Sequence, residues 1–294
     1  MTPTLKDRLF RVVHAAGYTV VPNWRVERHP QTAYLQKLFG LLSIDCVLDV
    51  GANVGQYRDF LRDEVGFGGQ IVSFEPIPAH AESMRSRAAR DPNWTIENCA
   101  LGAAPGMATL NVMTSTTFSS FLQPKGSETH IFDISNDVRD RISVTVRTLD
   151  SILPAVKQRL GVTNVYLKLD TQGFDLEVVR GAADSIRSIR ALQTEASLRP
   201  IYEGMPLFST VLQALESQGF EPSGIFPNNE GHFPLLFEFD FHMRTISRAV
   251  SQTQPVIFGH CRRHSSGAWA ALACSGFWRL GRRRFSAASP QCTG

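Results

Sequence analysis

Carboxylates close several short apolar runs in this sequence, and these side chains have the chemistry of a reactive site. Glu75 ends the run 70–75, Asp170 follows 165–169, and Glu195 ends 191–195. An ionised carboxylate accepts hydrogen bonds from hydroxyl groups and can also take a proton from one. Ligands of open α/β sheets bind beyond the carboxyl ends of the strands. The three residues therefore predict a ligand site along one edge of a sheet.

A glycine turn after residues 46–50 is expected to form the other part of this site. The apolar run stops at Gly51, residues 51–55 read Gly-Ala-Asn-Val-Gly, and apolar residues then recur at helical spacing. This pattern predicts a buried strand, a tight turn and a helix. Asp49, near the end of the strand, is expected to face a cationic group of the ligand, directly or through water.

The turn distinguishes between ligand classes. The string G-x-x-x-x-G-K of a phosphate-binding loop is absent. Asn53 stands where a dinucleotide fold has the glycine that lets the backbone approach a pyrophosphate. Glu75, 24 residues after Gly51, is placed to accept hydrogen bonds from both ribose hydroxyls, although it could instead cap the following turn. A nucleoside ligand without phosphates, such as S-adenosylmethionine, fits this pattern.

Seven residues are predicted to contact S-adenosylmethionine. Asn98 and Ala100 follow the third strand, where an adenine ring would dock, although an ordinary strand end is an equal alternative. The predicted set is Asp49, Gly51, Asn53, Gly55, Glu75, Asn98 and Ala100.

Several segments in order resemble the FkbM family of S-adenosylmethionine-dependent methyltransferases. They are Val-Leu-Asp-Val-Gly-Ala-Asn-Val-Gly-Gln-Tyr (47–57), Ser-Phe-Glu-Pro (73–76), Asn-Cys-Ala-Leu-Gly (98–102), Ser-Ser-Phe (119–121), Arg-Thr-Leu-Asp (147–150), Lys-Leu-Asp-Thr-Gln-Gly-Phe-Asp-Leu-Glu-Val-Val-Arg-Gly-Ala (168–182) and Glu195. The resemblance implies a class I methyltransferase fold, S-adenosylmethionine as cofactor, and O-methylation of a sugar, glycolipid or polyketide-type hydroxyl. Gln172 departs from the family pattern, because many relatives carry an acid there.

Removal of the hydroxyl proton requires a base, and Asp170 and Glu195 are the candidate catalytic residues. Asp170 could instead cap the next helix, and Glu195 could pair with Arg199. His80 is expected to be a solvated side chain. No metal is expected, because no Asp-Asn pair follows a predicted strand.

The elements that must position these residues alternate between strand and helix. The pattern predicts an α/β fold with a doubly wound, mostly parallel sheet and an antiparallel final strand. Strands are expected at 46–50, 70–75, 94–99, 165–169, 191–195, 220–226 and 235–241, and helices at 4–16, 32–42, 55–65, 79–90, 149–160, 174–186 and 207–218. Residues 107–113 and 142–146 alternate as an antiparallel pair does, and 114–140 is expected to be a mobile surface loop.

Three parts of the chain are predicted: a helical N-terminal cap (1–44), the methyltransferase domain (45–244) and a basic tail (245–294). The tail has seven arginines and no acid, whereas the first 244 residues are mildly acidic. This predicts no nucleic-acid partner and a tail that is either a poorly ordered extension or a weak contact with an anionic membrane surface. Absence of a long apolar segment and of paired cysteines predicts a cytoplasmic protein. The sequence does not define the oligomeric state.

Two other functions are compatible with such a sheet. An NAD-linked oxidoreductase would use a similar strand order, but Asn53 and the absence of an evident Tyr-x-x-x-Lys motif argue against it. A non-catalytic S-adenosylmethionine-binding module remains open, because the acceptor-side base rests on position alone.

Overall fold

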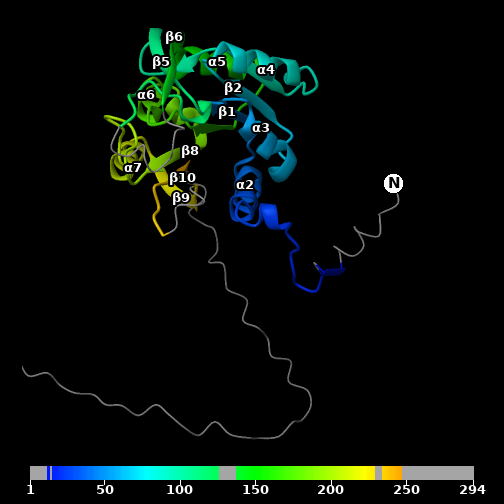
Figure 1. Ribbon diagram of the computed structural model, residues 1–294. Coiled ribbons are helices and arrows are strands. Elements are labelled where there is room, and N and C mark those ends of the chain that lie inside the picture. Colours follow the sequence, from blue (N-terminus) through cyan, green and yellow to red (C-terminus); the bar gives the residue numbers. More distant parts are fainter. Residues whose placement is uncertain (1–11, 14, 126–136, 229–233, 247–294) are drawn as a thin grey trace, which may run out of the picture. The chain divides into compact units, whose positions relative to one another are not determined.

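The computed structural model describes residues 12–246 except 14, 126–136 and 229–233 (Figure 1). The helix predicted at 4–16 falls largely outside the described residues, and so does the tail from 247 onward with its predicted membrane contact. Among the helices that are described, none has the length and apolar character needed to cross a membrane.

A seven-stranded sheet is the centre of the described fold. Its order is β3-β2-β1-β7-β8-β10-β9, with β10 antiparallel to both of its neighbours and the first five strands parallel. The strands are β1 (Cys46–Val50), β2 (Gln70–Phe74), β3 (Trp94–Glu97), β7 (Val165–Leu169), β8 (Ile189–Ser197), β9 (Phe220–Pro227) and β10 (Glu238–Thr245). The predicted mostly parallel sheet with an antiparallel last strand is confirmed. The predicted start of that last strand at 235 is wrong, because β10 begins at Glu238.

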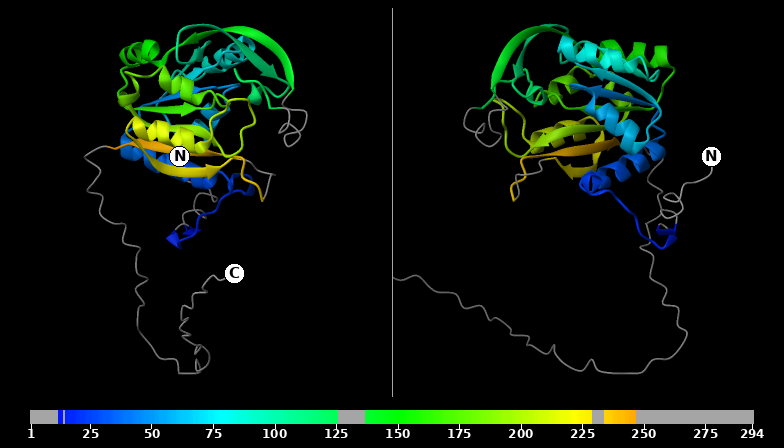
Figure 2. Two further views of the ribbon diagram at one scale, coloured as in Figure 1. Left: turned by 90° about the vertical axis from the view of Figure 1, so that its left-hand side faces the viewer. Right: turned by 45° about the vertical axis from the view of Figure 1, so that its right-hand side comes forward.

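Helices cover both faces of this sheet, as the two views of Figure 2 show. Apolar side chains of α2 (His29–Leu42), α3 (Gln56–Phe60) and α4 (Pro78–Ala88) pack in one buried cluster with Val47 and Tyr166. Those of α5 (Leu149–Leu160), α6 (Asp175–Arg180) and α7 (Phe208–Ser217) pack in a second cluster with Leu48 and Leu167. Because side chains of one strand alternate between faces, each central strand contributes to both clusters. The sheet is therefore doubly wound.

The predicted helices 55–65 and 174–186 differ from the structure. Helix α3 ends at Phe60 and continues as a π-helical turn, Leu61–Val65. Helix α6 stops at Arg180 because the chain then meets the loop after the third strand: a Cβ on Gly181 would lie 2.0 Å from the Gly102 carbonyl oxygen. Asp150 accepts hydrogen bonds from the backbone amides that follow, at Asp184 and Ser185.

A second, three-stranded sheet lies beside the carboxyl-terminal edge of the first one. Strand β6 (Val138–Arg147) pairs antiparallel with β5 (Gly106–Met113) and parallel with β4 (Ala100–Leu101). This confirms the predicted antiparallel pair. The prediction of a mobile loop over 114–140 is wrong at both of its ends, because 138–140 belong to β6 and 116–118 form a short 3-10 helix bonded to the central site. Residues 126–136 lie outside the described part.

Candidate functional site

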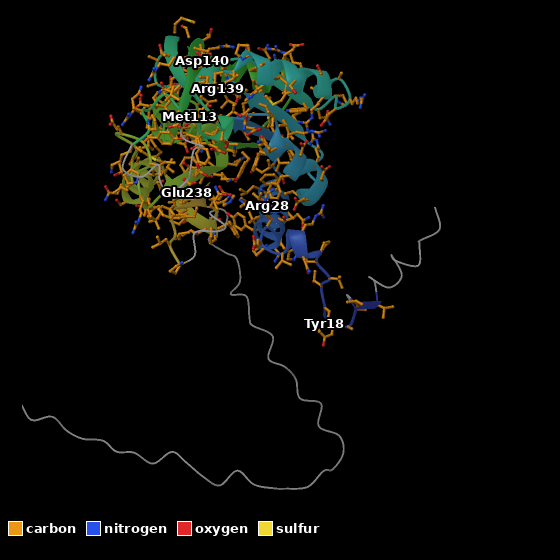
Figure 3. All side chains as sticks on the ribbon, viewed as in Figure 1. Tyr18, Arg28, Met113, Arg139, Asp140 and Glu238 are labelled. Atoms are coloured by element: carbon orange, nitrogen blue, oxygen red, sulfur yellow. The ribbon has the colours of Figure 1, made fainter. Side chains whose placement is uncertain are left out.

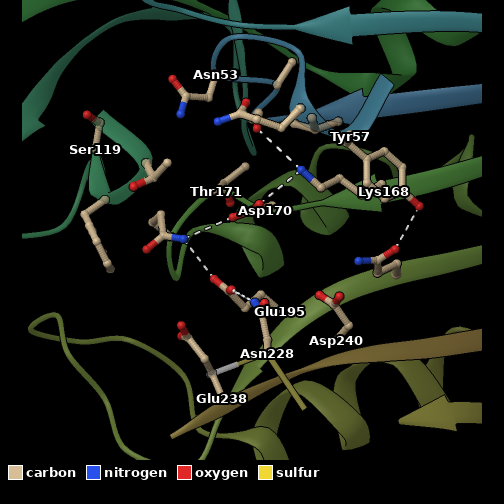
Figure 4. Close-up of a pocket in the computed structure, with 18 of the residues that line it drawn as sticks. Asn53, Tyr57, Ser119, Lys168, Asp170, Thr171, Glu195, Asn228, Glu238 and Asp240 are labelled. Carbon is tan, nitrogen blue, oxygen red and sulfur yellow. Dashed lines mark hydrogen bonds and ion pairs between the residues drawn. The ribbon is translucent and has the colours of Figure 1, made fainter. Parts of the chain in front are cut away.

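One cavity of about 1080 Å³ opens along the carboxyl ends of β1, β2, β7 and β8. Figure 4 shows the side chains that converge on it. One half, at β1 and β2, is lined by Val50, Gly51, Ala52, Asn53, Phe74, Glu75, Pro76, Ile77, Ala100, Leu101 and Leu110. The other half, at β8 to β10, is lined by Glu195, Ile225, Phe226, Pro227, Asn228, Glu238 and Asp240, with Asp170 between the two halves.

The turn after β1 is shaped by close backbone approach. Gly51 has a φ of 80°, and a Cβ there would lie 1.9 Å from the Asp170 carbonyl oxygen at the end of β7. Only glycine fits this contact. Asn53 also has a left-handed φ of 48°, which asparagine tolerates better than most residues. The two residues bend the chain so that the amide of Asn53 points toward β2.

Glu75 connects the turns after β1 and β2. Its Oε2 accepts a hydrogen bond from the Asn53 amide and its Oε1 one from the Ile77 amide, both at 2.8 Å. The residue is only 4% exposed, yet it lines the cavity. Burial raises the pKa of Glu75 to about 7, although the two backbone hydrogen bonds oppose this shift. Glu75 therefore caps a turn, the alternative weighed from the sequence, and also presents its carboxyl group to the cavity.

Asp49 does not line the cavity, so a direct contact with a ligand is contradicted, whereas a contact through water stays a prediction. It is fully buried and forms an ion pair with Lys168 (3.3 Å), its register partner on β7, and accepts a hydrogen bond from Ser73 (3.1 Å). Burial by itself would lower the pKa of Lys168, but the charges of Asp170 and Asp49 outweigh it and raise that pKa above its ordinary value. Lys168 thus connects β1 to the centre of the site.

Two further predicted contact residues lie outside the cavity wall. Gly55 begins α3 with a φ of 89°, and a Cβ there would contact the Trp94 ring at 3.0 Å, so its role is packing. Asn98 donates from its side-chain amide to the carbonyl oxygens of Glu75 (2.8 Å) and Pro76 (3.2 Å), which braces the turn after β2. Ala100, by contrast, does line the cavity.

The two predicted catalytic carboxylates are joined by one amide. Gln172 Nε2 donates to Asp170 Oδ1 at 3.1 Å and to Glu195 Oε2 at 2.8 Å. Asp170 Oδ2 also pairs with Lys168 Nζ at 3.1 Å, and the Asp170 side chain is 36% exposed to the cavity. A carboxylate has about four acceptor positions, so Asp170 keeps free lone pairs. The alternative that Asp170 caps the next helix does not hold, since Asp175 takes the Thr171 amide instead.

Glu195 lies in a different electrostatic environment from Asp170. Its Oε1 accepts from Asn228 Nδ2 at 2.6 Å, and no ion pair with Arg199, the predicted alternative, occurs among the described residues. Burial first, and then the charges of Glu238 and Asp170, raise the pKa of Glu195 well above its ordinary value. The two carboxyl groups therefore have different neighbours: Asp170 lies beside the cation Lys168, and Glu195 lies among other acids.

Thr116, Tyr202 and Lys168 were not singled out as site residues from the sequence, whereas Ser120 belongs to the Ser-Ser-Phe segment (119–121) of the family resemblance. Thr116 Oγ1 donates to Asn53 Oδ1 (3.2 Å), Ser120 Oγ donates to the Gln172 carbonyl (2.8 Å), and the Tyr202 hydroxyl donates to Gln172 Oε1 (3.0 Å). Lys168 had a signal, because a lysine in an otherwise apolar buried run requires a partner. The others come from segments distant in sequence, and only the fold brings them to the cavity.

His80 is half-buried rather than solvated. Its Nδ1 lies 3.9 Å from Glu75 Oε1, and burial followed by the charge of Arg139 lowers the pKa of its ring. Within the described part of the chain, no three histidine, cysteine, aspartate or glutamate side chains lie where they could hold one metal ion.

Strand order, glycine turn and strand-end carboxylates together define a class I methyltransferase fold. The chain belongs to the FkbM family of S-adenosylmethionine-dependent methyltransferases: residues 49–222, more than half of its length, match the family model described as the methyltransferase FkbM domain. The resemblance inferred from the sequence motifs and the fold class are thereby confirmed, and S-adenosylmethionine is the cofactor of this family, as predicted.

Solved structures with a similar arrangement are distant in sequence. The FkbM methyltransferase of Methylobacillus flagellatus KT is 16% identical with a TM-score of 0.43, covering 67% of this chain and 43% of its own length. Aeropyrum pernix fibrillarin, solved with S-adenosyl-L-methionine, is 13% identical (TM-score 0.38, 68% of this chain and 66% of its own). Magnesium protoporphyrin IX methyltransferase of Synechocystis PCC 6803 is 11% identical, with a TM-score of 0.41; the match covers 83% of this chain and 100% of that enzyme's chain. The chain thus spans less than two thirds of the first two structures. A search of curated proteins finds no match to this chain.

Proposed function

We propose that the protein transfers a methyl group from S-adenosylmethionine to a hydroxyl group of a small molecule such as a sugar, glycolipid or polyketide. The half of the cavity at β1 and β2 fits the donor. Glu75 presents a carboxyl group for the two ribose hydroxyls, and Ala100 and Leu101 offer an apolar surface for adenine. Gly51 lets this turn approach the end of β7 closely, because a Cβ there would meet the Asp170 carbonyl oxygen.

When bound, the donor supplies a methyl group on a sulfonium and leaves as the neutral thioether S-adenosylhomocysteine. The protein has to orient the acceptor oxygen and take its proton. Asp170 is the proposed base, because it lies between the two halves of the cavity and has free acceptor positions. The proton passes from the acceptor hydroxyl to a carboxylate oxygen of Asp170, while the oxygen forms its bond to the methyl carbon.

Glu195 has a positioning role in this proposal. Burial and the charge of Glu238 raise the pKa of Glu195 well above its ordinary value, which favours the neutral form of this carboxyl group, and a neutral acid is a poor base. Its two oxygens already hold Gln172 and Asn228. Glu195 therefore holds Gln172 and Asn228 in place, and these side chains form the side of the cavity against which the acceptor lies.

A single observation carries the proposal: one cavity has Glu75 at its donor end and Asp170 in its middle. The test is incubation of the purified chain with methyl-labelled S-adenosylmethionine and a small-molecule extract, followed by chemical analysis of the labelled product. We expect a methyl ether. Labelled product carrying its methyl only on nitrogen, sulfur or carbon would overturn O-methylation, and tight donor binding without any labelled product would favour the non-catalytic module.

A further inference from the structure

Glu238 is a carboxyl group of the cavity whose role the methyl transfer does not explain. It lies near the start of β10 and is 8% exposed, with its side chain on the cavity wall (Figures 3 and 4). Within the described residues its carboxylate has neither a hydrogen bond nor an ion pair. Burial, and then the charges of Asp170 and Asp240, raise the pKa of Glu238 to about 7. A buried carboxylate without a partner is costly, since desolvation is not repaid by any contact.

The adjoining residues increase this cost. Asp240 stands two residues along the same strand, and it is the direct register partner of Glu195 on β8. Like charges disfavour one another's ionised forms, and, after burial, the charge of Asp240 also raises the pKa of both Glu195 and Glu238. Asp240 accepts hydrogen bonds from Gln31 (2.7 Å) and from Gln193, and neither of these amides carries a charge. Three acids therefore gather on one wall, and in the described part of the chain none of the three forms an ion pair, although the charge of Lys168 acts to lower the pKa of Asp240.

The basic side chains that line the cavity do not form ion pairs with Glu238 or Asp240 among the described residues. Of the described residues, Lys168 and Arg28 are the basic ones that line it. Lys168 is engaged by Asp49 and Asp170, and Arg28 is exposed beside the start of α2. A cationic ligand in this part of the cavity would supply the positive charge that Glu238 and Asp240 lack in direct contact.

We propose that the methyl acceptor carries a protonated amine, which binds the carboxylates of Glu238 and Asp240 while its hydroxyl faces Asp170; this inference rests on the proposed methyl transfer. An ammonium group has three N–H donors and no acceptor, so it suits two neighbouring carboxylates. Its charge also favours their ionised forms. The acceptor class is thus a hydroxylated amine, such as an amino sugar.

The experiment uses a small-molecule extract of the source cells, divided on a cation exchanger at pH 7 into retained and unretained fractions. Each fraction is incubated at pH 8 with the full chain and methyl-labelled donor, and part of the retained fraction is first N-acetylated to remove its ammonium charges. Two variants are compared with the unchanged chain: Glu238→Gln, and Glu216→Gln as the matched control, because Glu216 is exposed on α7. Titration with S-adenosylhomocysteine confirms that each variant keeps its donor site.

We expect label in the retained fraction, its loss on N-acetylation, and at least tenfold less label with Glu238→Gln but not with Glu216→Gln. Label in the unretained fraction alone would overturn the inference and leave the methyl transfer standing. Label in the retained fraction that survives both N-acetylation and Glu238→Gln would overturn it as well. Activity lost with EDTA and restored by Mg²⁺ would assign the acidic wall to a metal ion, again contradicting an amine. No label in any fraction would count against both proposals.

Discussion

Gln172 controls the geometry of the two candidate catalytic carboxylates. Its amide nitrogen bridges Asp170 and Glu195, and its own conformation is fixed by Tyr202, Ser120 and a left-handed φ of 53°. Many relatives have an acid at this position. A neutral amide here donates to both carboxyl groups at once, which an ionised acid cannot do.

Because Asp170 and Glu195 lie in different environments, replacing each by its amide should change kcat to a different extent. Asp170→Asn removes the base, so kcat should fall about 10²- to 10⁴-fold. Glu195→Gln leaves the proposed base in place and should cost less than about tenfold at pH 7. Steady-state kinetics measures both, with S-adenosylhomocysteine affinity as the control for folding. Equal losses in the two variants would contradict this division of roles.

Glu75 predicts a pH dependence of donor binding. Its ionised form accepts ribose hydroxyl hydrogen bonds best, and its pKa is raised to about 7. Affinity should therefore fall as the pH decreases through 7, by about tenfold between pH 8 and pH 6 for a group of that pKa. Calorimetric titration with S-adenosylhomocysteine measures this. Glu75→Gln should bind more weakly and lose the dependence; an unchanged pH profile in that variant would rule out Glu75 as its source.

Carboxylates at strand ends were predictable as site residues, whereas their partners were not. Glu75, Asp170 and Glu195 line the cavity because parallel strands present their carboxyl ends at one edge. The direct ligand contact predicted for Asp49 was wrong because its partner Lys168 depends on the register between β1 and β7. Glu238 and Asp240 were not singled out, because a charged alternation in a strand is usually a solvated face.

At the scale of elements, the contact between β1 and β7 depends on one glycine. Gly51→Ala would place a Cβ 1.9 Å from the Asp170 carbonyl oxygen and would also strain a φ of 80°. We expect a loss of about 3 kcal/mol or more in unfolding free energy, together with loss of donor binding. Chemical denaturation followed by circular dichroism measures the stability.

Gly40 provides the matched control for that substitution. It lies inside helix α2, and a Cβ there would meet no atom within 4 Å. Gly40→Ala should therefore stabilise the protein by about 0.5–1 kcal/mol, the difference in helix propensity. A Gly51→Ala variant as stable as Gly40→Ala would show that the turn is not held against β7.

The buried strands were the most predictable elements. Strands β1, β2 and β7 follow their predicted bounds to within one residue, because strands buried on both faces form continuous apolar runs. The last strand was placed too early because Leu235 and Leu236 extend its apolar pattern, although they are 47% and 39% exposed. Helix α6 was predicted too long because its end is set by the contact between Gly181 and Gly102, which no local pattern contains.

At the scale of the whole molecule, the acidic site predicts how stability depends on pH. The folded-state pKa values of Glu75 and Glu238 are both about 7, above their unfolded values near 4.5. Between these values the folded state binds more protons than the unfolded state, so stability should fall as the pH rises from about 5 to above 7. Thermal denaturation across this range measures the trend, and Glu238→Gln should flatten it. A rise of Tm with pH over the same interval would contradict the assignment.

The central claim is that the cavity at the ends of β1 and β2 is a methyl-donor site. Calorimetric titration of the full chain at pH 8 with S-adenosylhomocysteine, and separately with NAD, tests it most directly. The account predicts one S-adenosylhomocysteine bound per chain, weakened by Glu75→Gln, and no measurable NAD binding, since Asn53 stands where a pyrophosphate needs a glycine. Tight binding of NAD without binding of S-adenosylhomocysteine would contradict it.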